Sequence, residues 1–310
     1  MKDRTSKLQT IKNSLRKHWL LYVMLVPVLL WYLIFCYAPM GGIIIAFKNY
    51  RFDMGIFKSP FIGLDNFSKM LTDTYFLRGV KNTLIFSFGR IIFQMPCAIL
   101  LAILLNELAY TKLKRIIQTV VTVPHFISWV VLAGILTKLF GSSGIINQIL
   151  GTLGLGSVSP IMNSGSFRAF IWIGNIWKEI GWDAIIYLAA ITSVDQGLYE
   201  AASIDGAGRL RRIWHITLSG IRGTICIMLI LAVGQVMTNG SFDQIFNLYS
   251  APVYDVADTL DTYIFRETFA TGGLNYGYST AIGLFKSLVG VVLILISNKV
   301  VTKAGENGLL

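Results

Sequence analysis

The chain has 310 residues, of which 54% are hydrophobic and only 14% charged, and its mean hydropathy is +0.63. This composition excludes an ordinary soluble domain and indicates an integral membrane protein. The net charge of +11 raises nucleic-acid binding as an alternative, but the basic residues are dispersed and form no stripe interleaved with aromatic residues. We therefore expect membrane lipid, and no nucleic acid, as the counter-charge.

Six apolar stretches are each long enough to cross ~30 Å of hydrocarbon at ~1.5 Å per helical residue. They lie at 19–47, 80–105, 116–140, 167–191, 223–246 and 278–301. Lipid offers no partners to backbone groups, so each stretch must be a helix. The sequence predicts an all-α, polytopic membrane protein with a six-helix domain at 19–301, a basic N-terminal tail at 1–18 and a short C-terminal tail at 302–310.

The first stretch contains helix-breaking residues at 38–42, including Pro39. We expect the membrane-crossing part to end near Ala38, with 43–47 as a separate interfacial piece. The basic tail before this stretch resembles a signal peptide, but the stretch is too long and lacks a small-residue cleavage site. The first stretch is therefore interpreted as an uncleaved membrane anchor.

Lysine and arginine set the predicted orientation. With the N-terminus inside, the cytoplasmic segments carry 14 of these residues and the outer segments 6. Both termini are therefore predicted to be cytoplasmic. The outer loops 141–166 and 247–277 are rich in turn formers, and they are either solvated connectors or a docking face for an extracytoplasmic partner. The cysteines and histidines are scattered, which predicts neither a disulfide nor a metal site.

The cytoplasmic segment 195–222 is more ordered than a slack connector. Asp195 is placed to cap a helix, and Gly206 and Gly208 supply a joint after it. Beyond the joint, apolar residues recur at helical spacing on one expected face, with basic residues on the others. The face consists of Leu210, Ile213, Trp214, Thr217 and Leu218. Such a helix either anchors the loop at the membrane surface or contacts a cytoplasmic protein.

The order of residues in this segment favours the second interpretation. The run EAASIDGA at 200–207, followed by an aromatic residue, an isoleucine and a leucine, resembles the cytoplasmic loop signature of ABC importer permease subunits. The matching residues are Glu200, Ala201, Ala202, Asp205, Gly206 and Ala207, then Trp214, Ile216 and Leu218. The resemblance implies a type I ABC importer permease fold and a coupling helix that inserts into a cleft on a separate ATPase subunit. Ser219 and Gly223 replace two prolines that make the local kink after the loop in the family.

Further segments resemble sugar-importer permeases, and more narrowly the branch for oligosaccharide or polysaccharide uptake. They are 59–67, 124–129, and Trp177 with Gly181 and Trp182 ahead of 187–190. The resemblance implies that the protein lies in a bacterial cell membrane, carries an oligosaccharide and has four kinds of partner. The partners are a second, homologous permease in a heterodimer, two ATP-binding subunits, an extracytoplasmic sugar-binding protein and membrane lipid. The chain has no G-x-x-x-x-G-K-[ST] phosphate loop, so no cofactor is expected on it, and ATP and Mg²⁺ are expected on the partner subunit.

Polar residues inside the membrane are costly and mark a candidate substrate path or a contact between helices. Gln235, Asn239 and Asp243 are spaced to form one stripe on the fifth span. The fourth span carries a second candidate group, namely Lys178, Glu179, Asp183, Trp177 and Trp182. Sugar hydroxyls bind donors and acceptors beside aromatic faces. The alternative is that Lys178, or Arg90 of the second span, pairs with Glu179 or Asp183 to join helices.

Two other function classes compete with a permease. An ion-coupled secondary transporter of a small polar solute would favour internal repeats and discontinuous helices, and no clear six-span repeat is present. A membrane-embedded enzyme needs paired catalytic groups at one depth. Only Glu179 and Asp183 approach that arrangement, without a histidine or nucleophile beside them in the sequence. The sequence therefore predicts a permease and no enzyme.

Overall fold

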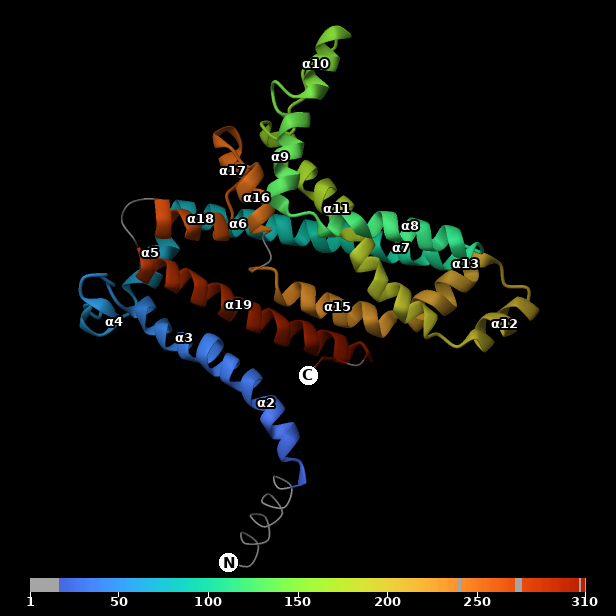
Figure 1. The fold of residues 1–310 in the computed structure, drawn as a ribbon, viewed down its shortest axis with the longest axis horizontal. Helices are drawn as coiled ribbons and strands as arrows, with labels where there is room; N and C mark the ends of the chain where they lie inside the picture. The colour runs from blue at the N-terminus through green and yellow to red at the C-terminus, as the bar shows by residue number, and fades with distance from the viewer. Residues whose placement is uncertain (1–16, 239–240, 271–274, 307, 310) are drawn as a thin grey trace, which may run out of the picture. The chain divides into compact units, whose positions relative to one another are not determined.

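A computed structural model describes residues 17–238, 241–270, 275–306 and 308–309 of the chain (Figure 1). Two compact units are distinguished and are described by themselves. The first takes residues up to Asn66 together with Asn275–Ala281, and the second takes Phe67–Leu274 and Ile282–Leu310. Apart from an isolated bridge between Lys48 and Phe61, the secondary structure of the described residues is helical. Asn239 and all but the end of the basic tail lie outside the described residues.

The first membrane-length helix, in the first unit, runs without a break from Trp19 to Phe47. Its consecutive parts are α2 (Trp19–Tyr32), a π-helical turn (Leu33–Tyr37), α3 (Ala38–Met40) and a 3₁₀ helix (Gly41–Phe47). The expected break in the helix near Ala38 is therefore wrong, whereas the end of the membrane-crossing part stays a prediction. The π turn before Pro39 changes the hydrogen-bond register, and the 3₁₀ helix absorbs the two glycines. No residue of α2 is buried within the chain, as expected for a helix that lipid or another subunit surrounds.

A small lobe after the first helix belongs to the first unit. After the helix, the chain turns through α4 (Gly55–Lys58) to the beginning of α5 (Asp65–Thr72). The Lys48 ammonium donates to the carbonyls of Ile56 at 2.7 Å and Phe57 at 3.1 Å. The Asn66 amide donates to the carbonyl of Ala46 at 2.8 Å. These bonds fix the lobe onto the end of the helix.

Two long helices and most of a third lie in the second unit. The second span is continuous from Thr74 to Glu107, with α6 (Thr74–Gly89) and α7 (Met95–Glu107) joined by a π turn at Arg90–Gln94. It packs against α11 (Ser164–Thr192). Ala98 and Ala102 lie fully buried in that contact, where small side chains let the two backbones approach closely. The last span is α19 (Tyr276–Lys303).

The third predicted span, 116–140, is not one helix. The chain forms α8 (Thr111–Thr122), a 3₁₀ turn (Val123–Phe126) and then α9 (Trp129–Phe140), which α10 (Ile145–Thr152) follows. Pro124 removes a backbone donor, and the Ser128 hydroxyl caps α9 by accepting from the Val131 amide at 3.3 Å. The prediction of a single helix is therefore wrong at Pro124.

The fifth predicted span, 223–246, is also interrupted. The helix α15 (Arg222–Gly234) ends well short of the predicted limit, and α16 (Phe242–Leu248) begins as a separate helix. The segment 251–270 follows, and we call it the outer segment after its predicted orientation. It consists of short helices, namely a 3₁₀ turn (Ala251–Val253), α17 (Tyr254–Ala257), α18 (Leu260–Phe265) and a π turn (Arg266–Ala270).

The outer segment is fastened to the second span by buried hydrogen bonds. The Asn82 amide donates to the carbonyls of Asp255 at 3.1 Å and Asp258 at 2.9 Å. The Thr83 hydroxyl accepts from the amide of Leu260 at 2.9 Å. The fully buried Asp258 carboxylate accepts two bonds from Arg266, and this pairing raises the pKa of Arg266 above its usual range. The segment is thus a fixed part of the second unit.

By length and hydropathy, four helices of the described chain qualify as membrane spans, or five if one bent pair counts as a span. The bent pair is Arg209–Gly220 with Arg222–Gly234, which meet at 59°. With its 29 residues, α11 is long enough to span the membrane as well, but it carries Arg168, Lys178, Glu179 and Asp183. Figure 1 shows α12 (Gln196–Ile204) and α13 (Arg209–Arg212) at the end of the second unit where α7 finishes and α8 begins.

Candidate functional site: a coupling loop and a polar cavity

The segment 195–222, which we call the coupling loop after its predicted role, forms the predicted helix, joint and second helix. The Asp195 carboxylate caps α12 by accepting from the Gly197 amide at 2.9 Å. At the other end, the amide of Ala207 donates to the carbonyl of Ala202 at 2.8 Å, and that of Gly206 donates to Ser203 at 3.1 Å. These two bonds and the φ of +73° at Gly206 define a Schellman motif. The geometry requires a positive φ at Gly206, whereas the φ of Gly208 is an ordinary −66°.

Two side-chain bonds hold α12 against the second helix. The hydroxyls of Tyr199 and Thr217 lie 3.0 Å apart, and Arg212 donates to the Ser203 hydroxyl at 2.9 Å. Thr217 is buried, so the first of these bonds fixes α12 to the inner part of the loop. The loop therefore has a defined shape.

The apolar face predicted for the second helix is divided in two. Ile213 and Leu218 pack against the core that α7 and α11 share. Leu210 is 83% exposed and Trp214 69% exposed, and Ile204 at the end of α12 is 87% exposed. The core therefore takes up only the later residues of this face. The loop presents large apolar side chains to its surroundings.

The kink after the loop forms without the two prolines of the family. The helix from Arg209 meets α15 at 59° across Ile221, whose side chain is 1% exposed in the core. Ile221 has φ −96° and ψ 4°, outside the helical region, so the bend is made at this residue. Ser219 lies in the helix before this residue, and Gly223 lies in α15 after it.

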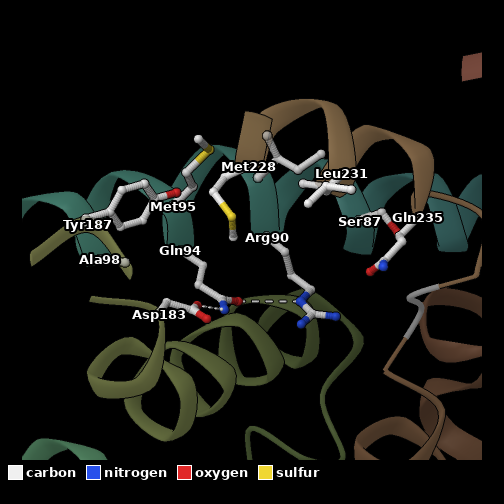
Figure 2. Close-up of a pocket in the computed structure, with 12 residues that line it drawn as sticks. Ser87, Arg90, Gln94, Met95, Ala98, Asp183, Tyr187, Met228, Leu231 and Gln235 are labelled. Carbon is white, nitrogen blue, oxygen red and sulfur yellow. Dashed lines mark hydrogen bonds between the residues drawn. The ribbon is translucent and has the colours of Figure 1, made fainter. Parts of the chain in front are cut away.

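A polar cavity of about 300 Å³ lies in the second unit, between the second span, α11 and α15 (Figure 2). Its charged and polar lining is Ser87, Arg90, Gln94, Asp183, Tyr187 and Gln235. Its apolar lining includes Met95 of the second span and Met228 and Leu231 of α15. The π turn at Arg90–Gln94 offsets the helix register at the residues that line the cavity, which is a common place for such turns.

Hydrogen bonds join the charged groups of the cavity into one chain. The Arg90 guanidinium donates to the Gln94 side-chain oxygen at 3.4 Å, and the Gln94 amide donates to Asp183. Figure 2 shows the three side chains converging from the second span and α11. The Asn175 amide also donates to the oxygen of Gln94. The arrangement presents donors and acceptors that can bind a hydroxyl-rich or charged solute.

The structure brings only part of the predicted substrate path together. Asp183 and Gln235 line the cavity. Asp243 is exposed on α16 and is not among the lining residues, and Asn239 lies outside the described residues. The single helical stripe of Gln235, Asn239 and Asp243 is a wrong prediction, because α15 ends at Gly234.

Lys178 and Glu179 contribute to a different contact. The Lys178 ammonium donates to the carbonyl of His125 at 2.7 Å and to Glu179 at 2.8 Å, and the Glu179 carboxylate lies 2.5 Å from the His125 ring. Trp182 stacks on His125 at a centroid distance of 4.4 Å, and Trp177 is half exposed. These residues join α11 to the break at Pro124. The predicted alternative, a contact between helices, describes Lys178 and Glu179 in this structure.

Sequence reasoning missed Ser87 and Tyr187 as cavity residues. Arg90 and Gln94 stand out in the sequence as intramembrane polar residues, and their i, i+4 spacing is the available signal. Ser87 donates to the carbonyl of Val236 at 2.6 Å, a contact 149 positions away that the sequence pattern does not reveal.

Membrane-length helices around a polar cavity, with an ordered loop at one end of the bundle, define the class of integral membrane transport components. Residues 94–304 match the family described as the binding-protein-dependent transport system inner membrane component. The chain belongs to this family, and it is a multi-pass permease of the bacterial inner membrane.

Two curated relatives are similar over nearly their whole length. The protein LplB of Bacillus subtilis is 42% identical over 95% of this chain and 92% of its own. The polygalacturonan/rhamnogalacturonan transport system permease protein YteP, from the same organism, is 42% identical over 93% of this chain and 89% of its own.

Two solved structures share the fold. A chain of a bacterial ABC transporter involved in import of the acidic polysaccharide alginate aligns with TM-score 0.85 and 38% identity, over 94% of this chain and 98% of that one. A chain from the bacterial alginate ABC transporter in complex with an alginate pentasaccharide-bound periplasmic protein aligns with TM-score 0.86 and 37% identity, over 96% and 99%. The fold is accordingly the all-α fold of an ABC importer permease.

Proposed function

We propose that the chain is the permease subunit of an ATP-driven importer that carries oligosaccharides or polysaccharide fragments into a bacterial cell. The observation that carries this proposal is the match, over more than nine-tenths of both chains, to an importer of the acidic polysaccharide alginate. A permease for polygalacturonan and rhamnogalacturonan at 42% identity supports the same substrate class. The cavity, with Arg90, Asp183 and several hydrogen-bonding groups, suits a solute of this chemistry.

The proposed assembly has a second homologous permease, two ATP-binding subunits that hold ATP and Mg²⁺, and an extracytoplasmic sugar-binding protein. Each permease forms half of the translocation path. The coupling loop is the proposed contact with the ATPase, since Leu210 and Trp214, which follow the joint at Gly206, are exposed. Glu200, Ala201, Ala202, Asp205, Gly206 and Ala207 form the proposed docking residues.

The test is reconstitution of the complex in liposomes, with oligosaccharide-stimulated ATP hydrolysis and uptake as readouts. Gly206→Pro is expected to abolish both, because proline fixes φ near −65° and removes the amide that donates to Ser203. Glu200→Arg reverses a charge at the proposed interface and is expected to impair coupling in a folded protein.

Gly208→Ala is the matched control. Gly208 has an ordinary φ, and a Cβ added there would have no atom within 4 Å, so this variant should retain activity. Wild-type activity in Gly206→Pro and Glu200→Arg would contradict the coupling role. Uptake driven by an ion gradient in the absence of ATP would favour a secondary transporter instead.

A further inference from the structure

Aromatic side chains form a continuous series along α16 and the outer segment that follows it. Ring centroids lie 5.0 Å apart between Phe242 and Phe246, 4.8 Å between Phe246 and Phe265, and 5.3 Å between Phe265 and Phe269. A branch runs from Phe246 to Tyr249 at 5.9 Å and on to Tyr254 at 4.9 Å. We call these six residues the aromatic ladder.

Phe242 and Phe246, the first two rings of the ladder, lie on the face of α16 that is not buried in the protein. The opposite face of α16 is anchored in the protein, since Gln244, Ile245 and Leu248 are buried and Gln244 donates to the carbonyl of Ile171 at 2.7 Å. None of the six rings of the ladder is buried, and Phe269 at its end is 65% exposed. Tyr249 packs against a core cluster, whereas the other five rings of the ladder are not among the residues that pack on it.

The ladder begins where the polar cavity ends. Arg90, which lines the cavity, donates to the Ser241 hydroxyl at 3.1 Å. Ser241 immediately precedes Phe242, the first ring of the ladder, and it adopts a left-handed φ of 56° that is uncommon for a residue other than glycine. The rings thus continue from the cavity wall onto the outer segment.

The base of the ladder is fixed. Phe265 and Phe269 flank Arg266, which is bound by Asp258 at 2.7 and 3.1 Å, and the Thr262 hydroxyl donates to the same carboxylate at 2.9 Å. A fixed aromatic surface loses little conformational entropy when it binds a ligand.

We propose that the aromatic ladder binds successive sugar rings of an oligosaccharide between the outer face and the polar cavity. This inference rests on the proposed function, and it names a binding surface on the outer side of the same path. A pyranose ring has apolar C–H faces that pack on aromatic rings and hydroxyls at its rim. The hydroxyl of Tyr254 and the carboxylate of Asp243, both exposed beside the rings, supply groups for that rim.

The experiment compares an alginate pentasaccharide with an alginate disaccharide in the reconstituted complex. Phe246→Leu retains apolar volume but loses the flat ring, whereas Phe246→Tyr retains the ring. Phe269→Leu changes an exposed side chain and should not disturb folding. Phe57→Leu, on the first unit and 93% exposed, is the control for loss of an aromatic side chain outside the ladder.

We expect Phe246→Leu and Phe269→Leu to raise the half-saturating concentration of the pentasaccharide about three- to tenfold. The disaccharide should be affected by less than about twofold, because it contacts fewer rings. Phe246→Tyr and Phe57→Leu should behave as wild type. Assembly with the second permease, measured by co-purification, should be unchanged in every variant.

Unchanged pentasaccharide kinetics in both leucine variants would overturn the inference and leave the ladder as an apolar surface for lipid. Reduced assembly with unchanged kinetics in the remaining complex would also overturn it, and would assign the ladder to the second permease. A wild-type complex that no oligosaccharide stimulates would contradict the proposed function itself, and the ladder's role with it.

Discussion

At the residue scale, Gly181 sets how closely two helices approach. A Cβ at this position would lie 2.1 Å from the carbonyl oxygen of Val121, so α8 passes directly over the glycine. We predict that Gly181→Ala destabilises the protein by about 1–3 kcal/mol or more, because the obstructing atom is backbone and cannot rotate away. The midpoint of thermal unfolding in detergent measures the effect.

Gly174 on the same helix provides the matched control. Its nearest neighbour would be the Gln244 side-chain nitrogen at 3.6 Å, which is ordinary contact. Gly174→Ala gains the same helix propensity and should unfold at or above the wild-type temperature. Equal unfolding temperatures for the two variants would show that α8 does not pack on Gly181 at this distance.

Lys178 is a second residue whose role is a contact between helices. It is buried, and it bonds to both Glu179 and the carbonyl of His125. We predict that Lys178→Met costs about 3–5 kcal/mol, because it leaves a carboxylate without its cation. Adding Glu179→Gln should restore part of that stability, since both charges are then removed. Unfolding of the single and double variants measures the coupling.

The same pair of variants tests whether Lys178 belongs to the substrate path. Lys178 does not line the cavity, so uptake per assembled complex should remain close to wild type in the double variant. A large loss of uptake at normal stability would return Lys178 and Glu179 to the path.

At the scale of elements, the coupling loop transmits force only if its two helices move together. The bond between Tyr199 and the buried Thr217 is one of two side-chain bonds described between them. We predict that Tyr199→Phe together with Ser203→Ala raises the number of ATP molecules hydrolysed per sugar imported. Docking should persist, because the exposed residues of α12 that form the proposed interface are unchanged.

Thr192→Val is the control for that experiment. It also removes a hydroxyl close to the coupling loop in sequence, but the hydroxyl of Thr192 bonds to the carbonyl of Ala189 within its own helix. An unchanged ratio of ATP hydrolysis to uptake in the double variant would show that these two bonds are not needed for coupling.

Sequence reasoning succeeded where the signal is local. The cap at Asp195 and the joint at Gly206 each depend on a few neighbouring residues, and both predictions are confirmed. It failed at Pro124 and after Gly234, because hydropathy is averaged over a long window and does not register a break inside an apolar stretch. The cavity required tertiary information, since Ser87, Asp183 and Gln235 come together only when three distant helices pack.

At the scale of the whole molecule, the charge distribution predicts the orientation of every loop. The segments assigned to the cytoplasm hold 14 of the Lys and Arg residues and the outer segments 6, although the loop at 48–79 alone holds 5. The proposed docking of the loop at 195–222 on a cytoplasmic ATPase requires the same orientation. A test of the orientation of the chain is therefore also a test of the proposed coupling role of this loop.

Single cysteines in a background that lacks Cys36, Cys97 and Cys226 test this orientation. We predict that Ser157→Cys, exposed in the loop after α10, reacts with a membrane-impermeant maleimide in intact cells. Ser203→Cys in the coupling loop and Lys303→Cys at the end of α19 should react only after the membrane is permeabilised. Labelling of Ser203→Cys from outside would reverse the orientation and separate the coupling loop from any cytoplasmic ATPase, which would contradict the proposed function as well.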